Sequence, residues 1–291
     1  MIQNLKNPPI GIGSRSCHRI SGSTVVVKYG GAAMVDSDLR AACLQDVARL
    51  HRQGTRVVLV HGGGPEVSQE MRRQGLEPRF VGGLRVTDEA ALVVTQRVLV
   101  GSTNRALVAG LQALGIPAVG FCAGDGGTVR VTGKSADLGL VGEVSAVNPD
   151  LLQTLLKSGF VPVVAPLGAD AEGQAYNVNA DTIASAVAAA LNASRLILLT
   201  DVDGIRTNPD DPETALQDCT GQDLWRLKAD GAVQGGMIPK VEAILQTLSA
   251  GVQTVQVLDG RRPHALRDAL VPGRAPGTTV TNPQEALCQI A

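Results

Sequence analysis

The stretch Arg56-Val-Val-Leu-Val-His-Gly-Gly-Gly-Pro65 decides the fold of this chain. Its apolar run has the length of a strand that is buried on both faces, and its glycines mark a tight turn at the strand's end. Pro65 suits the first turn of a following helix, where its missing N–H is not needed. A strand that passes through glycines into a helix is the unit of a parallel sheet with helices on its faces.

The same pattern recurs along the chain. Residues 24–28 form a buried strand that ends in Tyr29-Gly30-Gly31, and Asp36 or Ser37 caps the helix that follows. Helices are also predicted over residues 89–114, 150–158, 182–191 and 238–250, and strands over 116–120, 160–165, 195–200, 254–258 and 278–281. Residues 124–147 alternate apolar and polar positions, which indicates an antiparallel ribbon over a site. We therefore expect an α/β protein with an extension over residues 1–23 and two lobes, residues 24–175 and 176–291.

The composition excludes several classes of protein. The chain has 291 residues, 26 Lys and Arg against 27 Asp and Glu, and 2% aromatic residues. It therefore lacks the basic surface and the stacking platforms that nucleic-acid binding needs. No stretch is apolar enough for a bilayer span, and the scattered cysteines indicate reduced thiols. We expect a cytoplasmic protein with small-molecule partners, and we interpret its acid-free beginning as an extension rather than a targeting segment.

Three glycine-rich corners follow predicted strands. They are Lys28-Tyr-Gly30-Gly31, Gly62-Gly63-Gly64 and Asp201-Val-Asp203-Gly204. Glycine at the carboxyl end of a strand lets backbone N–H groups approach a ligand, and the N-terminus of the next helix favours anions. One corner can serve the turn alone, but three in one chain indicate a phosphate-binding crevice. The standard motifs are absent, since Gly133-Lys134-Ser135 lacks the earlier glycine of a P-loop.

Four charged residues stand at positions that suggest a ligand. Lys28 ends a buried strand, and Lys240 lies in the first turn of a predicted helix, where the macrodipole disfavours a cation. An anionic ligand explains both, whereas the alternative is a packed stem with a solvated ammonium group. Asp181 is either an N-cap residue or the carboxylate that fixes the two lysines. Arg85 is either a surface residue or a bidentate grip on a carboxylate.

The histidines do not indicate chemistry of their own. Their scattered positions show no metal-ligand spacing, and no nucleophile elbow is present, so we expect no metal site formed by the protein. We interpret His61 as a residue that orders the glycine turn rather than one that transfers protons.

Five segments of the chain resemble, in order, the motifs of one enzyme family. They are residues 26–34, 60–65, 83–88, 176–181 and 235–241. The chain is similar to the amino acid kinase family from about residue 24 to about residue 282, in particular to members that phosphorylate N-acetyl-L-glutamate. The resemblance implies a three-layer αβα sandwich around one mostly parallel central sheet. The N-terminal half would hold the amino acid and the C-terminal half the nucleotide.

The activity implied by the resemblance is ATP-dependent phosphorylation of the γ-carboxylate of N-acetyl-L-glutamate to N-acetyl-L-glutamyl 5-phosphate, the second step of arginine biosynthesis. ATP with Mg²⁺ would be a substrate. The residues that match the family's catalytic positions are Lys28, Lys240 and Asp181. The residues that match its substrate-binding positions are Gly63, Gly64, Arg85 and Asn177. The residues that match its nucleotide-binding positions are Gly30, Gly31, Asp201, Gly204, Arg206 and Gly236.

Regulation, assembly and the exact substrate stay open at this point. His264 and Gly277 lie in segments that resemble an arginine-effector site, although Ala269 stands where that site has an acid. We expect a homodimer, with a hexamer as the alternative, and binding of a nitrogen-signalling protein is undecided. N-acetyl-2-aminoadipate or a carrier-bound glutamate is an alternative substrate, because one methylene changes binding by only ~1–3 kcal/mol. A regulatory binding protein on the same scaffold is the alternative to an enzyme.

Overall fold

A computed structural model describes residues 22–208, 211–233, 237–271 and 276–282. The extension predicted over residues 1–23 lies almost entirely outside these ranges. Within them, no helix has both the length and the apolar content that a bilayer crossing requires.

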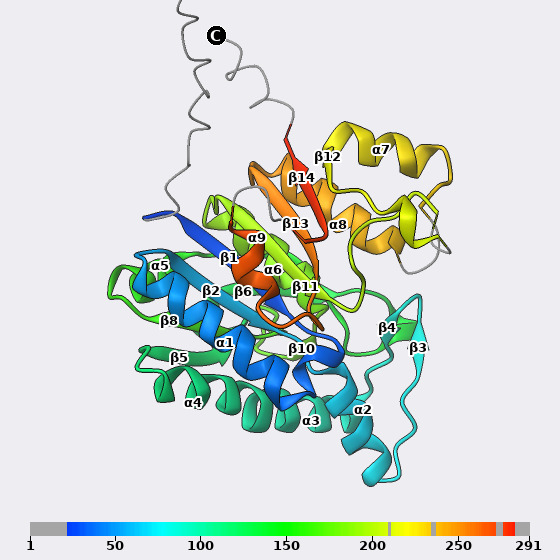
Figure 1. The fold of residues 1–291 in the computed structure, drawn as a ribbon. Coiled ribbons are helices and arrows are strands. Elements are labelled where there is room, and N and C mark those ends of the chain that lie inside the picture. The colour runs from blue at the N-terminus through cyan, green and yellow to red at the C-terminus, as the bar shows by residue number, and fades with distance from the viewer. Residues whose placement is uncertain (1–21, 209–210, 234–236, 272–275, 283–291) are drawn as a thin grey trace, which may run out of the picture.

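One eight-stranded sheet runs through the centre of the molecule (Figure 1). Its strands lie in the order β12 (Asp218–Thr220), β14 (Thr278–Thr281), β13 (Thr254–Asp259), β11 (Arg195–Thr200), β1 (Thr24–Tyr29), β2 (Arg56–His61), β8 (Val161–Ala165) and β5 (Ala118–Cys122). Neighbours from β13 to β5 are parallel, whereas β14 is antiparallel to β13 and parallel to β12. Strands of both predicted lobes share this sheet, because β1 pairs with β11, with Val26 opposite Leu196.

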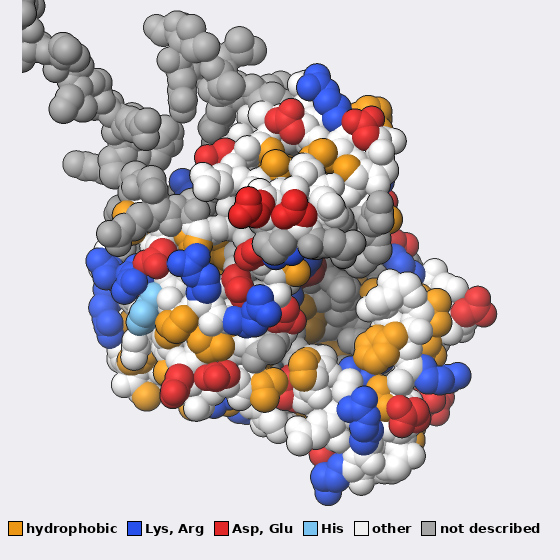
Figure 2. All heavy atoms as spheres, turned by 45° about the vertical axis from the view of Figure 1, so that its right-hand side comes forward, with side chains coloured by type: hydrophobic (Ala, Val, Ile, Leu, Met, Phe, Trp, Pro, Cys, Tyr) orange, Lys and Arg blue, Asp and Glu red, His pale blue; other side chains and the backbone are white. Residues whose placement is uncertain are grey.

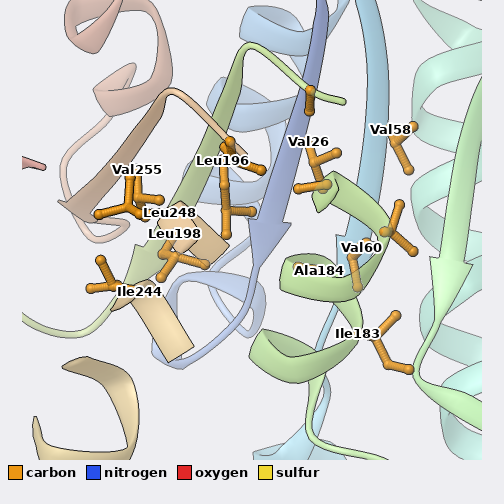
Figure 3. Close-up of a cluster of buried hydrophobic side chains, with 14 of the residues drawn as sticks. Val26, Val58, Val60, Ile183, Ala184, Leu196, Leu198, Ile244, Leu248 and Val255 are labelled. Atoms are coloured by element: carbon orange, nitrogen blue, oxygen red, sulfur yellow. The ribbon is translucent and has the colours of Figure 1, made fainter. Parts of the chain in front are cut away.

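Helices cover both faces of the sheet. On one face lie α1 (Ser37–Arg52), α4 (Arg105–Ala113) and α9 (Ala265–Ala269), and on the other lie α5 (Asp150–Lys157), α6 (Ala180–Ala190), α7 (Gly221–Ala229) and α8 (Met237–Ser249). Successive strand residues face opposite layers. Val26 therefore joins the core under α6 and α8 (Figure 3), while Val25 and Val27 join the core under α1. The three-layer sandwich is confirmed.

Two smaller sheets lie beside the main one. A four-stranded sheet has the order β10 (Ala175–Asn177), β9 (Leu167–Ala169), β6 (Val129–Gly133) and β7 (Gly142–Val147), and β3 (Phe80–Val81) pairs with β4 (Leu84–Arg85). Because β6 and β7 are antiparallel, the predicted ribbon is confirmed. Gly133 ends β6, so the short likeness to a P-loop indeed belongs to this ribbon. Short 3₁₀ turns cover Ala32–Met34, Asp125–Gly127, Ala136–Leu138 and Pro212–Thr214.

The single helix predicted over residues 89–114 has a different interior. It consists of α3 (Glu89–Gln96), a π-helical segment η2 (Arg97–Asn104) and α4. The next strand begins at Ala118 rather than at residue 116, because the N–H of Ile116 still closes the helix by donating to Leu111. The helix α2 (Gly64–Arg73) follows the glycines as predicted, with Pro65 in its first turn.

Candidate active site

Two lysines that are far apart in the sequence meet at one carboxylate. Lys28 lies on β1, Lys240 on α8, and Asp181 in the first turn of α6. Nζ of Lys28 lies 2.9 Å from Oδ1 of Asp181, and Nζ of Lys240 lies 3.3 Å from its Oδ2. The three side chains are only 12–18% exposed. The structure thus brings together the three residues that the sequence singled out for charge neutralisation.

The protonation of Asp181 follows from this arrangement. Burial alone would raise the pKa of its carboxyl group, but the ammonium groups of Lys28 and Lys240 outweigh burial and lower that pKa to about 2. Asp181 is not the N-cap residue of α6. Asn179 is, since its Oδ1 accepts from the N–H groups of Asp181 and Thr182 at 2.8 and 3.2 Å. The Asp181 carboxylate is therefore free to hold both lysines, and one negative charge faces two positive ones.

The first glycine corner is shaped by these charged side chains. A Cβ at Gly30 would lie 2.7 Å from Nζ of Lys28, so a larger residue at this position would require the flexible lysine side chain to shift. Gly31 has φ +76°, and a Cβ there would collide with the carboxylate of Asp201. The corner after β1 therefore lies against the corner after β11, in agreement with the prediction of one crevice.

The second glycine corner lines a cavity of about 190 Å³. Gly62, Gly63 and Gly64 share it with Arg85 and Asn177. The lysines and Asp181 do not line this cavity, but Asn179 and Ala180 do, so it lies beside the start of α6, directly before Asp181. Figure 2 shows the surface hollowed between the region of α7 and the β3–β4 hairpin.

Arg85 is buried and points into this region. Its Nη2 donates to the carbonyl oxygen of Gly64 at 2.9 Å and to Oγ of Ser68 at 2.8 Å, and its guanidinium carbon lies 4.8 Å from the centre of the Phe80 ring. Burial lowers its pKa, although an arginine stays charged. Asn177 donates to Oγ1 of Thr87 at 3.1 Å. The surface alternative for Arg85 is wrong, because the side chain is a buried donor beside the glycine corner.

The third corner holds three of the predicted nucleotide-binding residues, Asp201, Gly204 and Arg206. The guanidinium group of Arg206 lies 3.0 Å from the carboxylate of Asp203. Gly204 has φ +141°, and a Cβ there would lie 2.6 Å from Oγ1 of Thr278. This glycine therefore also serves the packing of β14. Gly236 lies outside the described residues. Within the described ranges, no group of three or more His, Cys, Asp or Glu side chains gathers as a metal site would.

The two candidate effector residues make structural contacts. Nδ1 of His264 lies 2.8 Å from Oδ1 of the buried Asp46 on α1. Gly277 has φ +87°, and a Cβ there would collide with the carbonyl oxygen of Val257. Their role toward arginine stays a prediction.

Sequence reasoning missed several polar partners of the site. Ser68 and Thr87 fix Arg85 and Asn177, and Asn104 contacts the histidine before the glycine corner. Thr87 was inside a recognised motif, but Asn104 carried no signal, because a polar residue within a long helix is ordinarily solvent-facing.

Known proteins add to this geometry. A model of the amino acid kinase family matches residues 23–259 of the chain. The chain belongs to the amino acid kinase family.

Its similarity to named members of the family is high. The acetylglutamate kinase of Symbiobacterium thermophilum is 49% identical over 269 residues, which cover 89% of this chain and 92% of that protein. The chloroplastic acetylglutamate kinase of Arabidopsis thaliana is 43% identical over 265 residues, which cover 90% of this chain and 76% of that protein. The prediction of a kinase of arginine biosynthesis is confirmed. As a kinase, this member of the family uses ATP as a substrate.

Solved structures share its fold. N-acetylglutamate synthase from Neisseria gonorrhoeae, complexed with coenzyme A and N-acetyl-glutamate, has a TM-score of 0.79 at 25% identity; the match covers 91% of this chain and 61% of that one. Carbamate kinase from Giardia lamblia, bound to AMP-PNP, has a TM-score of 0.65 at 19% identity; that match covers 90% and 99% of the two chains. The second likeness concerns the fold alone, and both agree with the amino acid kinase architecture.

Proposed function

We propose that this amino acid kinase transfers the γ-phosphoryl group of ATP to the γ-carboxylate of N-acetyl-L-glutamate. The products are N-acetyl-L-glutamyl 5-phosphate and ADP. The names of its relatives support the substrate. The observation that carries the proposal is the pair of ammonium groups held by Asp181 at 2.9 and 3.3 Å, beside a cavity lined by glycines.

The chemistry requires charge neutralisation more than proton transfer. An oxygen of the substrate carboxylate attacks the γ-phosphorus, and the bond from this phosphorus to the β–γ bridging oxygen breaks, with its electron pair leaving on ADP. The nucleophile is already ionised, so no general base is needed. Two anions must instead be brought into contact, which two adjacent cations favour. Lys28 and Lys240 supply these cations, and Asp181 fixes their separation.

The cavity beside the lysines suits the amino acid. Arg85 is a cationic fork for a carboxylate, and Asn177 offers an amide for the substrate's own amide group. Gly63 and Gly64 offer backbone N–H donors to the reacting groups. Because Arg85 is buried and fixed by Gly64 and Ser68, its fork is oriented before the substrate arrives.

The corners after β1 and β11 suit the nucleotide. Gly30 and Gly31 bring the backbone close to the expected phosphates, and Asp201, Gly204 and Arg206 lie at the neighbouring corner. Mg²⁺ would enter with ATP as part of the substrate. A cytoplasmic location agrees with the free thiols of Cys43, Cys122 and Cys219.

Chemical trapping of the acyl phosphate tests the proposal. Acyl phosphates react with hydroxylamine, so the protein with ATP and Mg²⁺ should form a hydroxamate from N-acetyl-L-glutamate. We expect N-acetyl-2-aminoadipate to give roughly tenfold less product, since one methylene changes binding by ~1–3 kcal/mol. Equal or greater turnover of the longer acid would overturn the substrate assignment, and no hydroxamate from either acid would overturn the kinase reaction. Added arginine in a parallel series tests whether arginine inhibits, as the resemblance of the segments around His264 and Gly277 implies.

A further inference from the structure

A buried polar network lies behind the second glycine corner, on the side away from solvent. His61 and Asn104 are both fully buried. The side-chain amide of Asn104 donates to the carbonyl oxygen of Val163 at 2.9 Å and lies 3.1 Å from Nε2 of His61, and its Oδ1 accepts from Nη2 of Arg105 at 2.6 Å. Nδ1 of His61 lies 2.7 Å from the carbonyl oxygen of Gly62.

The partners of this network determine where its protons are. A guanidinium group can only donate and a carbonyl oxygen can only accept, so the Asn104 oxygen faces Arg105 and its nitrogen faces Val163 and His61. Nε2 of His61 must then accept. The single proton of the neutral ring is on Nδ1, from which it is donated to Gly62. Burial lowers the pKa of His61 to about 4, which keeps the ring neutral.

The Gly62 contact fixes the direction of the next peptide N–H. In a trans peptide the carbonyl group and the following N–H point in opposite directions. Because the Gly62 oxygen faces the buried imidazole, the N–H of Gly63 faces away from it, on the side of the cavity that Gly62 and Gly63 line. Within the described part of the chain, this N–H donates no hydrogen bond.

The π-helical segment brings a second contact to the same corner. Gly63 has φ +152°, and a Cβ there would collide with Leu99. Leu99 and Asn104 are five residues apart, the hydrogen-bond spacing of a π-helix, which brings them nearer to one face than the ~100° per residue of an α-helix, where about 140° would separate them. The π-helical geometry therefore presents both side chains to the glycine corner. Gly120 makes room for Asn104, since a Cβ there would collide with its side chain.

We propose that His61 and Asn104 are positioning residues that hold the Gly62–Gly63 peptide so that the N–H of Gly63 points at the reacting phosphoryl or carboxylate oxygens. The inference rests on the proposed function, to which it adds two residues that do not touch the substrate themselves. A preorganised backbone donor of this kind stabilises the charge that develops during transfer.

Two amide variants of His61 test the donation to Gly62. The side-chain nitrogen of Asn lies near the position of Nδ1, whereas that of Gln reaches toward the position of Nε2. We expect His61→Asn to keep kcat within about fivefold of the parent and His61→Gln to lower it by ~10–100-fold, less than the ~10²–10³ for complete loss of such a donor. The KM for ATP should change by less than about threefold in both. His51→Gln on α1 is the control, with no expected change.

Asn104→Leu tests the second residue. Without its amide, the proton of His61 is free to move to Nε2, and we expect the kcat of Asn104→Leu to match that of His61→Gln. The double variant should be no slower than the slower single one, because the two residues act as one unit. Thermal unfolding and circular dichroism of each variant show whether it is folded.

The outcomes separate the two proposals. A parent protein that forms no acyl phosphate ends the proposed function, and the inference with it. An active parent whose folded His61→Asn and His61→Gln variants have equal kcat overturns the positioning role alone. The positioning role is also overturned if the variants change only KM, or if the loss of kcat in the double variant is the product of the two single losses. If His61→Gln or Asn104→Leu fails to fold, a loss of kcat of more than about tenfold in folded His61→Asn overturns the positioning role.

Discussion

The two parts of the candidate active site, the lysine pair at Asp181 and the corner Gly62–Gly64, differ in how they would handle negative charge. Around Asp181, full charges on three side chains from distant parts of the sequence meet at 2.9 and 3.3 Å. Around Gly62–Gly64, the chain offers uncharged peptide groups, and the histidine behind them is neutral. Charge acts over several ångströms and tolerates small displacements, whereas a peptide dipole must point in the right direction. The first part is therefore sensitive to charge, and the second to orientation.

The largest effect is expected from removing one cation. Lys28→Ala should lower kcat by ~10²–10³-fold, since a preorganised charge at the transferring group typically contributes that much. The measurement is hydroxamate formation at saturating ATP and N-acetyl-L-glutamate. Lys157→Ala, on the exposed end of α5, is the control and should leave kcat unchanged. A folded Lys28→Ala protein with parental turnover would remove the basis of the proposed function.

Asp181→Asn changes the position of the cations without removing them. The amide has the shape of the carboxylate but no charge, so the two ammonium groups lose the partner that holds them. We expect kcat to fall by roughly 10–100-fold, while ATP binds at least as well, because the site gains net positive charge. Separate KM and kcat values measure this, with the exposed Asp38→Asn as control. Weaker ATP binding at unchanged kcat would contradict the role of Asp181.

Much of the charged part could be predicted from the sequence. A lysine at the end of a buried strand and a lysine in the first turn of a helix are unfavourable without a partner, and this made Lys28 and Lys240 visible. The strand–glycine–helix pattern also predicted the parallel sheet that brings strand ends together. The N-cap role of Asp181 could not be decided in advance, because Asn179 is an equally good cap two residues earlier.

In the orientation-dependent part, the glycine corner and the ordering role of His61 were predicted, but the π-helical segment and Asn104 behind them were not. The π-helical segment has an ordinary helical composition, and its geometry goes with the contact of Asn104 to Val163, 59 residues away. Helix propensity contains no information about such distant contacts. The short strands β9 and β10 were missed for a different reason, because three residues are too few to show a periodic pattern.

An intermediate effect is expected at Arg85, whose side chain depends on both its charge and its orientation. Arg85→Lys keeps the charge but loses the planar fork that donates to Gly64 and Ser68. We expect the KM for N-acetyl-L-glutamate to rise about tenfold, with kcat and the KM for ATP nearly unchanged, because binding rather than charge development is affected. Arg73→Lys on the exposed side of α2 is the matched control. A purely kcat effect would place Arg85 at the phosphoryl group instead.

The smallest effect on turnover is expected from pH. Asp181 has a pKa of about 2 and His61 one of about 4, so neither should change kcat between about pH 6 and 8. The free energy of unfolding, in contrast, responds to His61 and to Asp181 in different pH ranges. Below pH 6.5 the unfolded chain protonates His61 while the folded protein does not, so stability is lost as the pH falls from 6.5 to about 4. The loss from Asp181 begins only below pH 3.8, where its unfolded carboxylate takes up a proton.

Urea denaturation of the parent and of His61→Asn at pH 7.5 and 5 tests whether His61 is neutral in the folded protein. Between pH 7.5 and 5 the free energy of unfolding should fall by about 2 kcal/mol more in the parent than in the variant, from 1.36 kcal/mol per pKa unit. His51 also has a lowered pKa, from burial first and then the nearby Arg52, but it is present in both proteins and cancels in the difference. Equal losses in both proteins would mean that His61 takes up its proton in the folded state, and the glycine corner would then depend on charge as the lysine pair does.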